Sequence, residues 1–309
     1  MATVALGEFT QNTRRHRSFV AILAISGLVF YKTLGALWTY SRNDDSSSHI
    51  VLVPLIAFFL LYVERERIFA ITSTSAGPGI TLALGGMILY ALAFRSPFPQ
   101  EGNWSLSLAT LSIVLVWIGG FLICYGFVAL RAAAFPLLFL LLMVPFPDAV
   151  LDRIIYALQA GSTEIAYLIF QAVGTPVSRD GFLLSVPGVT IEVAKECSSI
   201  RSSIALLITC LLAAHLYLRT RWKILLFVVL GILVSVLKNG IRIATLTLLS
   251  IHVDSGFLTG RLHHEGGFVF FLVALLILWP VFLWLERSDK PRRAMNPTTE
   301  KQPSMETPA

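Results

Sequence analysis

A polar stretch around Cys197 has the residue types that nucleophilic catalysis needs. It reads IEVAKECSSIRSS and stands between a short alternating run and a continuous apolar run that starts at Ile204. The alternation predicts a strand, and the apolar run predicts a membrane helix. A helix that begins near Cys197 would direct its free N–H groups and positive dipole end at the thiol, which favours the thiolate. A cysteine in an apolar chain usually acts as a small hydrophobic residue. Cys197 differs because its neighbours Glu196 and Arg201 are polar. Arg201 would lie one helical turn further on and on the same face, so Cys197 is a candidate nucleophile.

A second polar group lies inside the apolar run that starts near Ile224. It consists of Lys238, Asn239 and Arg242, and charged residues within a membrane helix indicate function. At about 1.5 Å per residue, Arg242 would lie about 27 Å along this helix, at the outer edge of the bilayer core. Lys238 is one turn deeper and is expected to pair inside the bundle. The alternative for Arg242 is a side chain that reaches the interface without a catalytic role.

The loop after this run contains His263, His264 and Glu265. Histidine transfers protons near neutral pH, so one of the two is a candidate general acid and base. A metal site is the alternative, but the helical HExxH arrangement is absent and adjacent loop side chains rarely bind one ion together. We predict no metal and no cofactor. Thiolate attack on a carbonyl, proton transfer by histidine and stabilisation of the oxyanion by arginine would combine into acyl transfer.

The composition indicates a polytopic membrane protein. The chain has 309 residues, of which 56% are hydrophobic and 14% charged, and its mean hydropathy is +0.76. The net charge of +6 does not indicate nucleic-acid binding, because lysine and arginine stand in the short connections between apolar runs. The three cysteines form no disulfide or zinc pattern.

The apolar runs predict an all-α protein with about eight transmembrane helices. The expected spans are 19–38, 50–63, 80–94, 106–130, 135–148, 204–217, 224–249 and 268–285. Pro145 and Pro147 should break the fifth. Residues 152–173 are too polar to face lipid. Positions 152, 156, 159 and 163 share one helical face, so we predict an amphipathic or re-entrant helix that covers a polar chamber. The sequence leaves open whether this helix crosses the bilayer. Residues 174–196 should form turns and two short extracytoplasmic strands.

Basic residues predict the orientation of the chain. Those near Arg65 and Arg219 place their connections in the cytoplasm together with both termini, so Cys197 should face the opposite side. We expect a cytoplasmic basic segment at 1–18, one transmembrane domain at 19–286 and a disordered cytoplasmic tail at 287–309.

The polar motifs resemble those of the exosortase/archaeosortase family of membrane transpeptidases, and the likeness covers nearly the whole chain. The family pattern CSG[IL]R after an extended run is similar to VAKECSSIR at 193–201, and NxxR matches 239–242. HxxxG followed by an aromatic residue matches 263–268, and the weaker stretches SHIVLVPLIAFFLL and FPLLFLLLMVPFP also fit. Ser199 replaces the usual glycine. The histidine doublet leaves His264 as an alternative to His263, which the spacing to the glycine favours.

This resemblance implies a multi-pass cysteine protease and transpeptidase of the bacterial inner membrane. The implied catalytic residues are Cys197, Arg242 and His263, with supporting residues Arg201, Asn239 and Glu196. The implied substrates are exported proteins with a C-terminal motif of PEP-CTERM type, a transmembrane helix and a basic cluster. They would be cut on the outer face and passed to an acceptor in surface glycoconjugate or exopolysaccharide assembly.

The alternative from another class is a polytopic transporter or channel. In that interpretation the intramembrane Lys238, Asn239 and Arg242 would line an anion path. It accounts for the buried charges and leaves Cys197 and the histidine pair without a role.

Overall fold

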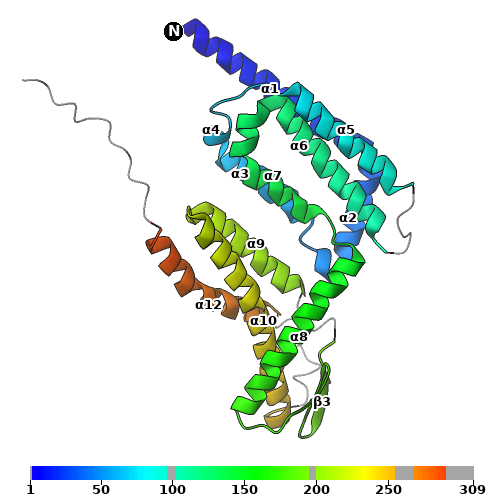
Figure 1. Cartoon of the computed structure of the whole chain (residues 1–309), viewed down its shortest axis with the longest axis vertical. Helices are drawn as coiled ribbons and strands as arrows, with labels where there is room; N and C mark the ends of the chain where they lie inside the picture. Colours follow the sequence, from blue (N-terminus) through cyan, green and yellow to red (C-terminus); the bar gives the residue numbers. More distant parts are fainter. Residues whose placement is uncertain (1, 96–101, 195–199, 255–266, 290–309) are drawn as a thin grey trace, which may run out of the picture.

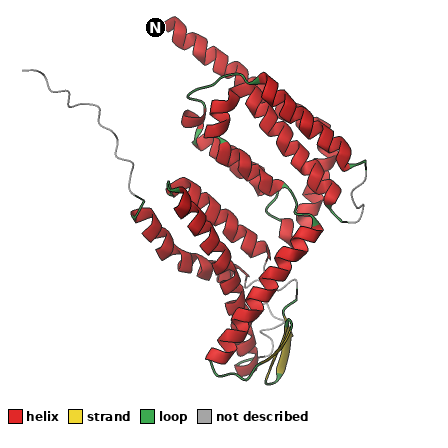
Figure 2. Ribbon diagram, in the orientation of Figure 1, coloured by secondary structure: helices red, strands yellow, loops and turns green. Residues whose placement is uncertain are grey.

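The computed structural model describes residues 2–95, 102–194, 200–254 and 267–289. Its elements in chain order are α1 (Ala2–Val29), α2 (Tyr31–Asn43), η1 (Asp45–Ser47), α3 (Leu52–Val63), α4 (Arg65–Ile68), α5 (Ala76–Ala93), α6 (Trp104–Ala132), α7 (Ala134–Phe139), η2 (Leu140–Met143), α8 (Asp148–Ala172), β1 (Ser178–Asp180), β2 (Leu183–Val186), β3 (Val189–Glu192), α9 (Ile200–Tyr217), α10 (Arg221–His252) and α12 (Gly267–Arg287). The protein is therefore a mostly helical polytopic membrane protein with one small sheet (Figure 2).

Five of the described helices are long and apolar enough to cross a membrane: α5, α6, α9, α10 and α12. The number is up to seven if each of two bent pairs is one span: α1 and α2 meet at 76°, and the α7–η2 segment meets α8 at 94°. The remaining apolar run is α3, whose 12 residues extend about 18 Å, less than the hydrocarbon core of about 30 Å. These elements account for all eight predicted apolar runs.

Helices α1 to α7 form one bundle, blue to green in Figure 1, in which α5 packs along α6. Aromatic side chains fill much of its core, with Phe19, Phe121 and Tyr125 in contact. Helices α9, α10 and α12 form a second group around their own apolar core. The large apolar side chains exposed on both groups are those expected to face lipid.

Asn103 and Asp148 hold the start of α8 against the first bundle. The N–H of Asn103 donates to Oδ2 of Asp148 at 3.1 Å, and the N–H of Asp148 donates to Oδ1 of Asn103 at 3.1 Å. Asn103 Nδ2 also donates to the carbonyl of Phe146 at 2.8 Å. The predicted break at Pro145 and Pro147 is confirmed, because η2 ends at Met143 and the chain turns before α8 begins.

The sheet lies beside the end of α8 that is remote from the first bundle (Figure 1) and packs on α8 and α10. It has three antiparallel strands in the order β1-β2-β3, one more than predicted. The strand that the sequence did not predict is β1. Its residues, Ser178 to Asp180, are all polar and exposed, so they lack the alternation of apolar and polar residues that indicates a strand. Gly181 and Gly188 turn the chain between strands with φ values of 59° and 85°, which glycine adopts readily.

Candidate active site

The sheet and α8 hold the chain immediately before the predicted nucleophile. Val193 is buried, its N–H donates to the carbonyl of Phe182 at 3.0 Å, and its carbonyl accepts a hydrogen bond from Gln159 Nε2 at 2.8 Å. The backbone is therefore fixed on both sides of Val193. The predicted site residues Glu196 and Cys197 follow at once but lie outside the described residues.

The chain is fixed again just after this segment, where α9 packs on α10. Lys238 Nζ donates to Oγ of Ser202, and Ser235 Oγ donates to Oγ of Ser203 at 2.6 Å. Only 1% of Lys238 is exposed, so the prediction that it pairs inside the bundle is confirmed. Two hydrogen bonds thus tie the first turn of α9 to α10, and the elbow 195–199 begins and ends at anchored positions.

Helix α8 packs closely on the same part of α10. Asn239 Nδ2 donates to Oγ of Ser162 at 2.9 Å, and both residues are buried. The helices approach at Gly240, where an added Cβ would lie 2.4 Å from Cγ2 of Ile165 and 3.1 Å from the carbonyl oxygen of Ser162. Glycine at this position allows the backbone contact that brings Asn239 to Ser162.

Arg242 follows Lys238 by one helical turn and is half-buried. It lies about 32 Å along α10 from Arg221, at a rise of about 1.5 Å per residue, and its depth in the bilayer stays a prediction. Arg201 is exposed in the first turn of α9. Arg201, Lys238 and Arg242 therefore come from turns of α9 and α10 that the Lys238–Ser202 bond joins, and their positive charge favours a thiolate or an oxyanion nearby.

The two predicted histidines, His263 and His264, also lie outside the described residues. Helix α10 ends at His252, before the segment that contains them, and α12 begins after it at Gly267. His252 is ten residues beyond Arg242, about 15 Å further along the axis of α10. The catalytic role of either histidine stays a prediction.

A family model described as transmembrane exosortase (Exosortase_EpsH) matches residues 38–280. The chain belongs to the transmembrane exosortase family. No curated protein and no solved structure matches it. The matched residues run from α2 into α12 and include every predicted site residue of this exosortase.

One prediction about this exosortase was wrong in part: the face of α8 that is buried differs from the face that was predicted to be buried. Positions 152 and 156 were expected to point inward with 159 and 163, but Asp152 is exposed and Tyr156 is 63% exposed. The buried face comprises Gln159, Ser162, Thr163, Ala166 and Phe170. These buried positions belong to the second half of α8, which packs on α10 and the sheet.

Sequence reasoning also missed the serines that orient the exosortase helices. Ser162, Ser202, Ser203 and Ser235 each bond to a neighbouring helix. Small hydroxyl residues at helix contacts are a common means of membrane helix packing, and their recurrence on three segments was the available signal. No group of three or more histidine, cysteine, aspartate or glutamate side chains in the described part of the chain could hold a metal ion.

Proposed function

We propose that this exosortase is a cysteine transpeptidase that cuts C-terminal sorting signals from exported proteins. The substrates would carry a short motif of PEP-CTERM type, a transmembrane helix and a basic cluster. Cleavage would occur on the outer face of the bacterial inner membrane, with both termini of the enzyme in the cytoplasm. The new carboxyl end would pass to an acceptor of surface glycoconjugate or exopolysaccharide assembly.

The bond between Lys238 and Ser202 is the observation that supports this proposal most directly. It holds the first turn of α9 against α10, while Gln159 holds the carbonyl of Val193. A nucleophile must be positioned to within a fraction of an ångström to react well. Anchors on both sides of residues 195–199 support such a constraint for Cys197. Lys238 lies on α10 together with Arg242, and Gln159 lies on α8.

In the proposed reaction the thiol of Cys197 gives its proton to the imidazole of His263, or of His264 as the alternative. The thiolate attacks the scissile carbonyl and forms a C–S bond, and the guanidinium of Arg242 binds the resulting oxyanion. When the intermediate collapses, the C–N bond breaks and the leaving amine takes the proton from the imidazolium. The acceptor then attacks the thioacyl carbon and loses a proton to the imidazole, the C–S bond breaks, and the sulfur takes that proton back from the imidazolium, which restores the thiol.

The supporting residues act on position and charge. Asn239 bonds to Ser162 and so sets the rotation of α10, which determines where Arg242 points. Arg201 adds positive charge near the elbow and favours the thiolate. Glu196 is proposed to orient the elbow next to the nucleophile.

The burial of Lys238 argues against the transporter interpretation. A residue that lines an anion path must meet water or the ion, whereas Lys238 is 1% exposed and its ammonium bonds to Ser202. Its described surroundings are those of a packed helix contact.

Processing of a tagged substrate tests the proposal. The enzyme is co-expressed with an exported protein that ends in a PEP-CTERM-type tail, and the mass of the product is measured for the wild type and for Cys197→Ala at equal abundance. We expect loss of the tail with the wild type only. Equal processing by both enzymes would refute the assigned nucleophile.

A further inference from the structure

A basic cavity of about 880 Å³ is lined by residues near the connection between α9 and α10 and by residues of the first bundle. Both helix groups contribute to it: Arg67 and Arg131 come from the first bundle, and Arg219 and Arg221 come from the connection between α9 and α10. Among the described lining residues, the four arginines share the cavity with a single carboxylate, Asp289. Arginines far apart in the sequence thus converge on one space.

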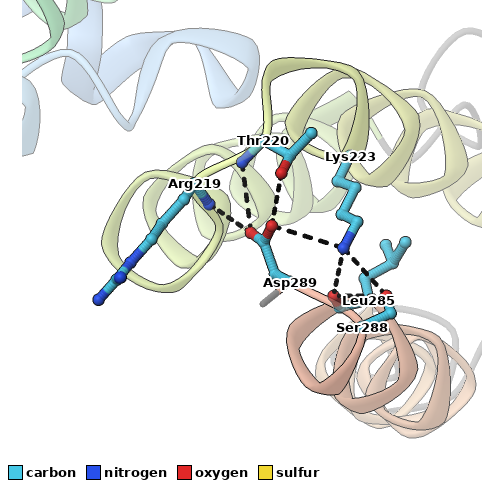
Figure 3. A network of polar contacts seen from close by, with 6 residues as sticks. All are labelled: Arg219, Thr220, Lys223, Leu285, Ser288 and Asp289. Carbon is cyan, nitrogen blue, oxygen red and sulfur yellow. Dashed lines mark hydrogen bonds and ion pairs between the residues drawn. The ribbon is translucent and has the colours of Figure 1, made fainter. Parts of the chain in front are cut away.

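The carboxylate of Asp289 is already used by other donors. It accepts hydrogen bonds from the backbone N–H groups of Arg219 and Thr220, from the hydroxyl of Thr220 and from Lys223 Nζ at 3.4 Å. The guanidinium of Arg219 is directed away from this network (Figure 3). Asp289 therefore neutralises the buried Lys223 and leaves the Arg219 side chain for the cavity.

The other arginines differ in how far the protein satisfies them. Arg67 pairs with Glu64 and donates to the carbonyl of Ala132 at 3.0 Å. Arg131 stacks its guanidinium 5.4 Å from the ring centroid of Phe127. Among the described residues, no carboxylate bonds to the guanidinium of Arg131, Arg219 or Arg221. Three exposed cations therefore face one cavity with unused donors.

We propose that this cavity binds the phosphate of an anionic phospholipid headgroup and thereby joins the two helix groups. Guanidinium groups bind phosphate oxygens in pairs of parallel hydrogen bonds, and basic pockets between membrane helices hold lipid headgroups. Leu216 lines the cavity and is 50% exposed, and Trp222, which follows the lining residue Arg221 in the sequence, is 56% exposed. Exposed apolar side chains of this kind fit acyl chains, which a free phosphate lacks.

The C-terminal tail is a poor alternative occupant. It continues directly from Asp289, but residues 290–309 contain four basic side chains, Lys290, Arg292, Arg293 and Lys301, against the two acidic residues Glu300 and Glu306. Four basic and two acidic residues leave the tail with a net positive charge, so the arginines of the cavity would repel it.

Lipid binding to the purified full-length protein tests the proposal. Native mass spectrometry in detergent measures how much phosphatidylglycerol or phosphatidylcholine the wild type, Arg131→Gln, Arg219→Gln and the double variant retain. Arg287→Gln is the matched control, because Arg287 is exposed near the end of α12 and does not line the cavity. Arg131→Lys and Arg219→Lys keep the charge and serve as second variants if a glutamine variant fails to fold.

We expect the wild type and Arg287→Gln to retain phosphatidylglycerol over phosphatidylcholine. Each glutamine variant should bind phosphatidylglycerol about tenfold more weakly, since a charge-assisted hydrogen bond is lost. Equal retention of the two lipids by the wild type, or wild-type retention by the double variant, would overturn the proposal. Displacement of phosphatidylglycerol by millimolar inorganic phosphate would overturn the assignment to a lipid and indicate a free phosphate site.

Discussion

Lys238 of α10 donates a hydrogen bond from Nζ to Oγ of Ser202 in the first turn of α9. The pair links two helices at the point where the chain leaves the predicted catalytic elbow. Among the described residues, Ser202 is the hydrogen-bond acceptor of this buried ammonium. The bond therefore affects both the stability of the helix contact and the position of the elbow.

Ser202→Ala should destabilise the protein by about 1–3 kcal/mol, because it leaves a buried charged donor without its acceptor. Unfolding in detergent, followed by circular dichroism, measures the change. Ser203→Ala is the matched comparison, since Ser203 bonds to the neutral Ser235 and should cost about 0.5–1.5 kcal/mol. If Ser202→Ala lowered the free energy of unfolding by less than Ser203→Ala does, the hydrogen bond from the Lys238 ammonium would not be the stronger of the two.

Gly240→Ala should separate α8 from α10. The new Cβ would lie 2.4 Å from Cγ2 of Ile165, and overpacking of this kind costs about 1–3 kcal/mol. Processing should fall as well, because the Asn239–Ser162 bond lies at the same contact. The control is Gly85→Ala on α5, where a Cβ meets nothing within 4 Å. Similar thermal midpoints for the two variants would show that the close contact is unimportant.

The contribution of the Asp289 carboxylate to the stability of the folded state should depend on pH. Hydrogen bonds from the N–H of Arg219, from Thr220 and the charge of Lys223 lower its pKa to about 2, against about 3.9 in an unfolded chain. A lowered pKa stabilises the folded state above about pH 4, and this contribution disappears as the pH falls towards about 2. The thermal midpoint of Asp289→Asn should therefore be below that of the wild type at pH 7, with the difference shrinking only below about pH 4. A difference that vanishes already between pH 7 and pH 5 would exclude this origin.

Arg242→Lys should fold normally and turn over slowly. Lysine keeps the charge but lacks the planar fork that would bind an oxyanion with two donors, and loss of one such donor costs about 10²–10³-fold in rate. Initial rates of tail removal, normalised to the amount of folded enzyme, measure the effect. Near-wild-type rates in this variant would remove Arg242 from the proposed role.

The apolar runs predicted the membrane helices because length and hydropathy are local properties of the sequence. The break before α8 was equally local, since Pro145 and Pro147 cannot continue a helix. The bend of 76° between α1 and α2 has no such signal. It occurs at Phe30, which is buried and packs its ring edge-on against Tyr90 at 4.7 Å, so tertiary contacts determine it.

The sequence predicted the types of the residues at the candidate site but not which residues they bond to. Lys238 could be expected to pair, because a charge in a membrane helix needs a partner. That the partner is Ser202 depends on the rotation of α9 against α10, which no pattern in either helix specifies. The convergence of Arg67, Arg131 and Arg219 on one cavity likewise depends on how the two helix groups pack.

The most direct test of the central claim is the mass of the acyl intermediate. Purified enzyme is mixed with a PEP-CTERM-type substrate, quenched in acid, digested and mapped by mass spectrometry. The account predicts a substrate acyl group on the peptide that contains Cys197, removable by hydroxylamine and absent from Cys197→Ala. An acyl group on any other residue, or full tail removal by Cys197→Ala, would contradict it.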